Sequence, residues 1–157
     1  MSEQHIRGQL VNMLTVQQAH MNFEDAVARF PAQHFNTRPP GVEYTFWHLL
    51  EHLRICQWDI LDYCRNPSYK ELNFPDDLWP ARDTVTDAAG WQRTIDQFLA
   101  DRAAMVALIK DPNTDLYAPI PHGYGGHTIF REVLVVADHN AYHIGEFGIL
   151  RQVLGIW

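Results

Sequence analysis

The chain has 157 residues, of which 46% are hydrophobic and 20% charged, and it contains five Trp, six Tyr and eight Phe. This composition excludes a disordered or low-complexity protein, and the length suits one domain covering residues 1–157. The net charge of −7, with the Lys and Arg residues scattered, argues against partners that are nucleic acids or anionic membranes.

The sequence contains no signal-peptide pattern at its start and no run of about 18 apolar residues, so we expect a cytoplasmic protein. Cys56 and Cys64 fall in one predicted helix, where a rise of about 1.5 Å per residue separates them by about 12 Å, too far for a mutual disulfide. Nine histidines are an unusual number for this length, and their spacing is the main functional signal.

The first two predicted helices lie in the N-terminal half of the chain. One covers residues 6–30 and ends at Pro31, and the other covers residues 43–64 and ends at Asn66-Pro67. The apolar stripe of the first is formed by Leu10, Met13, Leu14, Phe23 and Val27. A long stretch without apolar periodicity follows the second helix and predicts a crossover connection.

Two further helices complete the predicted fold. One begins after Asp87, a good N-cap residue, and ends at Asp111-Pro112. The last begins near Thr128 and continues to Leu154, with Gly155 as its C-terminal signal. Four long helices with one long crossover predict an all-α four-helix bundle in which the second and third helices run parallel.

The last helix carries the pair His139 and His143, four residues apart and therefore about one turn apart on one face. Two imidazoles at this spacing can share a metal ion. The pair lies beside the apolar residues Val136, Phe147 and Leu150, where unpartnered imidazoles are costly. The alternative is two buried histidines that are hydrogen-bonded to carboxylates or carbonyls.

A third ligand must come from another helix, and the second helix offers His48 and His52, again one turn apart. Periodicity alone does not choose between them. Three protein ligands and an open position are typical of catalytic zinc, whereas four ligands are typical of a structural site.

The segments Trp47–Arg54 (WHLLEHLR) and His139–Glu146 (HNAYHIGE), with Leu150-Arg151 and Gly155 after them, resemble the DinB-like (damage-inducible) four-helix family. The resemblance implies an up-down-down-up bundle, frequent homodimers and one divalent transition metal, zinc or nickel, with iron as a further candidate. Carried over by position, it implies the metal ligands His52, His139 and His143. Family members often have Gln where this chain has Glu146.

Four other residues are candidates for the site. Glu146 lies on the face of His139 and His143, where a carboxylate can orient a ligand or move a proton, although a surface ion pair is the ordinary role of such a residue. His48, Asp59 and Tyr124 are candidate substrate-binding residues, with structural or surface roles as their alternatives.

Two functions fit these observations. One is a metal-dependent enzyme, a thiol-dependent transferase or a hydrolase, that uses an open three-histidine site on a thiol or another small substrate. The other is a non-catalytic, metal-stabilised bundle that acts as a dimeric binding module, which a fourth ligand such as His48 or Glu146 would favour. A metal-free bundle with buried histidines is the third hypothesis.

Overall fold

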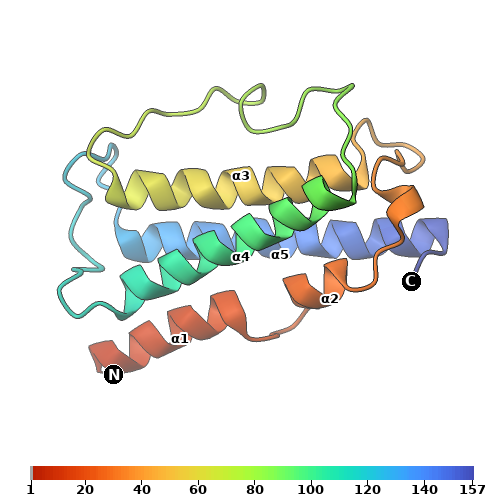
Figure 1. Cartoon of the computed structure of the whole chain (residues 1–157). Helices are drawn as coiled ribbons and strands as arrows, with labels where there is room; N and C mark the ends of the chain where they lie inside the picture. The colour runs from red at the N-terminus through yellow and green to blue at the C-terminus, as the bar shows by residue number, and fades with distance from the viewer. Residues whose placement is uncertain (1) are drawn as a thin grey trace.

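The computed structural model describes residues 2–157, which form helices and no strand apart from an isolated bridge between Pro119 and Thr128. Figure 1 shows the four long helices side by side, with α3 and α4 running in one direction and α1 and α5 in the other. The elements are α1 (Glu3–Thr15), α2 (Phe23–Val27), the 3-10 helix η1 (Ala32–His34), α3 (Phe46–Arg65), α4 (Ala88–Lys110) and α5 (Ile129–Leu154).

The first predicted helix is wrong in its extent, because residues 6–30 form two helices with a break between them. The side chain of Gln18 donates to the carbonyls of Asn12 and Val16 and so satisfies acceptors at the end of α1. The side chain of Asn22 then accepts from the backbone N–H of Asp25 and caps a new helix. Met13, predicted to be buried, is 49% exposed.

The other three helices begin at residues whose side chains cap them. Thr45 accepts from the N–H of His48, so α3 begins three residues later than predicted. Asp87 and Thr128 cap α4 and α5 as predicted. Gly155 has a φ of 64°, the left-handed conformation that commonly ends a helix, and the predicted end of α5 is confirmed.

A buried polar contact joins the centres of α3, α4 and α5. The Gln57 side chain, which is 1% exposed, donates from Nε2 to the carbonyl of Phe98 over 2.7 Å. Asn140 of α5 donates to Gln57 Oε1 over 3.1 Å. Aromatic and aliphatic side chains fill the core on either side of this contact, so the polar groups fix how α3 lies against α5.

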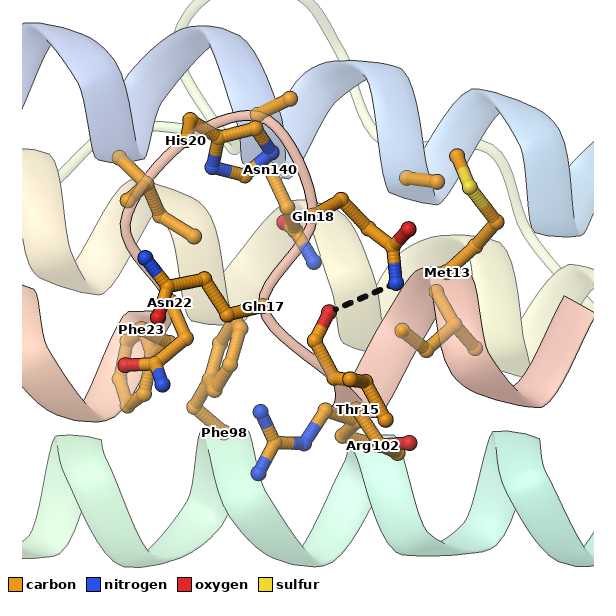
Figure 2. A pocket seen from close by; sticks show the side chains of 15 residues that line it. Met13, Thr15, Gln17, Gln18, His20, Asn22, Phe23, Phe98, Arg102 and Asn140 are labelled. Carbon is orange, nitrogen blue, oxygen red and sulfur yellow. Dashed lines mark hydrogen bonds between the residues drawn. The ribbon is translucent and has the colours of Figure 1, made fainter.

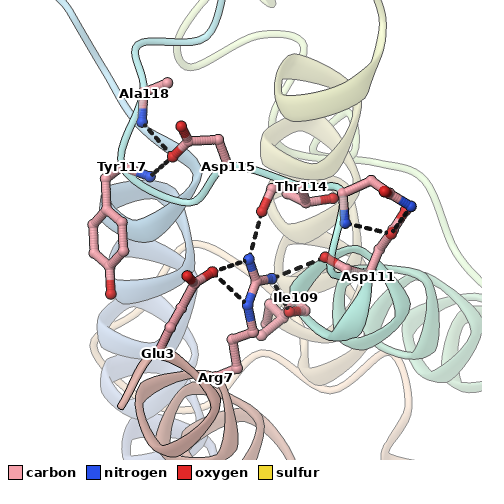
Figure 3. A network of polar contacts seen from close by, with 9 residues as sticks. Glu3, Arg7, Ile109, Asp111, Thr114, Asp115, Tyr117 and Ala118 are labelled. Carbon is pink, nitrogen blue, oxygen red and sulfur yellow. Dashed lines mark hydrogen bonds and ion pairs between the residues drawn. The ribbon is translucent and has the colours of Figure 1, made fainter. Parts of the chain in front are cut away.

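Arg7 of α1 caps the C-terminal end of α4 (Figure 3). Its guanidinium donates to the backbone carbonyls of Ile109, Asp111 and Thr114, and it also pairs with Glu3. The positive charge lies where the helix leaves unpaired carbonyls, an arrangement that favours a cation. Arg7 thereby anchors α1 to the end of the bundle.

The crossover, residues 66–87, lies along α3 (Figure 1) and is held to it by two histidines. His48 Nε2 lies 2.8 Å from the carbonyl oxygen of Thr84, and His52 Nδ1 lies 2.8 Å from that of Leu78. The crossover therefore forms a wall beside the imidazoles of α3. No helix among residues 2–157 is both long and apolar enough to cross a membrane.

Candidate metal centre

Three imidazoles from two helices meet beside the crossover. His52 comes from α3, while His139 and His143 lie one turn apart on α5. The Nε2 atom of His52 is 3.2 Å from Nε2 of His139 and 3.2 Å from Nε2 of His143. The structure thus brings together the three histidines that the family resemblance implied.

Hydrogen bonds to the other ring nitrogen orient two of these imidazoles. His52 Nδ1 faces the carbonyl oxygen of Leu78, which can only accept, so this nitrogen carries the proton. His143 Nδ1 faces a carboxylate oxygen of Glu146 at 2.8 Å, and the Tyr44 hydroxyl donates to the other oxygen. In the neutral rings of His52 and His143, Nε2 is therefore the bare nitrogen, as metal ligation requires.

The two bare nitrogens face each other without a proton to share. A separation of 3.2 Å between lone pairs is repulsive unless a cation lies among them. Protonation of His52 is unfavourable, because burial lowers its pKa to about 4. The donor set therefore fits a divalent metal ion better than it fits a protonated histidine cluster.

Cys56 is a further potential ligand, one turn after His52 on α3. Candidate ligand atoms of His52, Cys56 and His139 all lie within 4.8 Å of one another, a grouping that leaves out His143. The Nε2 atoms of His139 and His143 each lie 3.2 Å from His52 Nε2, so the two candidate ligand sets share His52 and His139. Burial raises the pKa of the Cys56 thiol to about 12, so the thiol is protonated at neutral pH when no metal is bound.

A cavity of about 480 Å³ opens onto the imidazoles. Its size is typical of small-molecule sites. The indole of Trp79 from the crossover stacks on the His52 ring at a centroid distance of 3.8 Å. The cavity is lined by His52, Cys56, Asp59, Ile60, Phe74, Leu78, Trp79, His139 and His143.

The remaining sequence candidates occupy different places. Asp59 lines the cavity, and Glu146 contacts His143 without lining it. His48 is turned to the carbonyl of Thr84, and Tyr124 is 55% exposed with its hydroxyl near Glu71. The structure therefore does not bring His48 or Tyr124 to the cavity wall.

Sequence reasoning missed two groups of residues at the site. Cys56 carried a usable signal, since it follows His52 by one helical turn. Trp79, Leu78 and Tyr44 carried none, because they belong to loops without periodicity and reach the imidazoles only through the tertiary fold.

A second, smaller cavity lies between α4, α5 and the break after α1 (Figure 2). Its volume is about 40 Å³, and its lining includes His20, Arg102 and Asn140. That volume suits a water-sized molecule rather than a substrate. Of these two cavities, the one beside the imidazoles is therefore the candidate functional site.

The fold and the site define an all-helical protein with a candidate metal centre between two of its helices. A family model described as the DinB superfamily matches residues 15–147, and the chain belongs to this family. No curated protein and no solved structure matches the chain.

Proposed function

We propose that the protein is a metal-dependent enzyme of the DinB superfamily that holds one divalent transition metal, zinc or nickel, with iron as a further candidate, through His52, His139 and His143. The observation that carries the proposal is the pair of bare Nε2 atoms held 3.2 Å apart in a buried site. The four long helices are proposed to be the up-down-down-up bundle of this family.

The open side of the site favours catalysis over a purely structural role. Three imidazoles leave coordination positions free, and the cavity provides space for a substrate next to them. When bound, the ion supplies Lewis-acid activation of a thiol or of water, as thiol-dependent transferases and hydrolases require.

The protein's own residues position the ligands and control solvent access. Leu78 and Glu146 fix the ring orientation of His52 and His143, and Tyr44 in turn holds the Glu146 carboxylate. Trp79 covers one face of His52 and excludes water from it. The Glu146 carboxylate contacts both Tyr44 and His143. It is therefore placed to orient the His143 ring and to accept a proton from that ring.

The alternative is a non-catalytic, metal-stabilised bundle, and one observation favours it. The Cys56 sulfur lies 3.4 Å from Nδ1 and 3.8 Å from Nε2 of His52. As a fourth protein ligand, Cys56 would close the coordination shell in the manner of structural zinc sites.

Metal content tests the proposed site. Protein purified without a histidine tag and reconstituted with zinc is expected to hold about one ion per chain. His52→Ala and His143→Ala are each expected to lose it, because each removes one of three ligands. His20→Ala, at an exposed histidine outside the site, is the matched control and keeps full stoichiometry. Elemental analysis measures all four proteins.

Two outcomes would change the assignment. Full stoichiometry in both His52→Ala and His143→Ala would refute the three-histidine site. With cobalt in place of zinc, a sulfur-to-metal charge-transfer band that disappears in Cys56→Ser but not in Cys64→Ser would select the closed, structural site.

We further propose that the protein forms a homodimer through the exposed face of α5. Tyr142, Ile149 and Val153 are 70%, 62% and 59% exposed and lie on one face of the helix. No side chain approaches the Cβ position of Gly145 on the same face within 4 Å, which leaves room for a second helix. Such an apolar stripe on a soluble chain is typical of an interface.

The mass in solution tests this interface. Analytical ultracentrifugation is expected to give twice the 18.2 kDa mass of one chain for the wild type and the monomer mass for Ile149→Glu. Val85→Glu, at a 70% exposed apolar residue on the crossover, is the matched control and stays dimeric. A monomeric wild type would end the proposal.

A further inference from the structure

The cavity beside the imidazoles has two ends that differ in chemistry. Asp59 follows His52 by seven residues on α3, so the two side chains leave the helix about 10 Å apart along its axis and on the same side. A small molecule that reaches the imidazoles with one end therefore places its other end near Asp59.

The wall between these ends is mostly apolar. Ile60 comes from α3, while Phe74, Leu78 and Trp79 come from the crossover. Phe74 is 78% exposed, so its ring presents a large apolar surface to water when the cavity holds no ligand. Such a wall gains free energy when it contacts an aromatic or aliphatic body.

The far end of the cavity is acidic. The Tyr69 hydroxyl donates to Asp59 Oδ1 over 3.0 Å and holds the carboxylate in place. Asp62 and Glu71 lie close enough to repel the charge on Asp59, and no Lys or Arg lines the cavity. An anionic group on a ligand would meet repulsion here, and a cationic group would meet attraction.

We propose that the cavity binds a small organic molecule with an aromatic or aliphatic body and an uncharged or cationic far end, and that Asp59 disfavours ligands that carry a carboxylate there. The inference rests on the proposed function, because the reactive end of the ligand faces the three imidazoles. It assigns a specificity-determining role to a residue remote from the candidate metal ligands.

Three benzylic thiols of similar shape test this charge preference. They are benzyl mercaptans with a para methyl, a para carboxylate or a para aminomethyl group. The dissociation constants are measured by calorimetric titration of the zinc-loaded protein. The methyl and aminomethyl thiols are expected to bind at least about tenfold more tightly than the carboxylate-bearing thiol. Asp59→Asn is expected to remove most of this difference.

Two further variants separate charge from packing. Asp96→Asn makes the same change on an exposed part of α4 and is expected to preserve the wild-type order of affinities. Phe74→Ala is expected to weaken all three thiols by a similar factor, because it removes apolar surface and no charge. A carboxylate that binds as tightly as the methyl thiol to the wild type would overturn the proposal.

The metal-free protein distinguishes failure of this inference from failure of the proposed function. Because Asp59 is remote from the imidazoles, the same order of affinities is expected without zinc, although each thiol binds more weakly. If the protein bound no zinc but still bound the three thiols in this order of affinity, only the metal site would be refuted. Zinc binding with equal affinities for the three thiols would refute the role of Asp59 alone.

Discussion

Replacing Glu146 with alanine is expected to weaken zinc binding by about 10- to 100-fold, although Glu146 is not one of the proposed metal ligands. Its carboxylate accepts from His143 Nδ1 at 2.8 Å and also holds the Tyr44 hydroxyl. Without it, the His143 ring loses both its fixed orientation and part of its basicity. Competition with a chromophoric chelator measures the dissociation constant.

Glu146→Gln is the informative companion variant. Its amide oxygen can still accept from His143 Nδ1 but carries no charge, so a smaller loss of zinc affinity is expected than for alanine. Glu43→Ala, which removes an exposed carboxylate paired with Arg82 at the surface, controls for net charge. If Glu146→Ala bound zinc as tightly as the wild type, the carboxylate would have no orienting role.

The second large effect is expected in the core next to the site. Phe147 follows Glu146 on α5, is 1% exposed, and packs against Phe30 and Phe46 at centroid distances of 5.4 and 5.3 Å. Phe147→Ala is expected to lower the free energy of unfolding by about 3–5 kcal/mol, because it removes buried apolar area and leaves a cavity. The melting temperature should fall by roughly 10 °C.

Urea unfolding of the metal-free protein, followed by circular dichroism, measures this change without a contribution from the metal. Phe74→Ala removes the same atoms from a side chain that is 78% exposed, so its unfolding midpoint is expected to stay near the wild-type value. Equal midpoints for the two variants would contradict the place of Phe147 in the core.

The sequence predicted the parts of the fold that depend on local signals. Asp87 and Thr128 were recognised as N-caps, and Gly155 as a C-terminal signal, because capping depends on a few neighbouring residues. The break between α1 and α2 depends on the same chemistry, but the Asn22 cap lies within a pattern that continues at helical spacing. The prediction for residues 6–30 rests on periodicity alone and therefore extends one helix across the break.

The candidate site was predictable only in part. His139 and His143 share a helix face because of their spacing, which can be read from the chain. The choice between His48 and His52 could not be made from periodicity, since both lie one turn apart on α3. The contacts with the crossover distinguish the two histidines. The carbonyl of Thr84 is hydrogen-bonded to Nε2 of His48, whereas the carbonyl of Leu78 is hydrogen-bonded to Nδ1 of His52 and leaves its Nε2 available to a metal.

The buried contact between Gln57 and Asn140 sets the axial register of α3 against α5. A slide of α5 by a single turn, about 5.4 Å, would break this hydrogen bond and leave the Asn140 amide and the Gln57 side-chain oxygen without this partner. The same slide would also separate His52 from His139 and His143. The polar pair in the core therefore preorganises the three imidazoles, so the proposed metal ligands are already in place once the chain has folded.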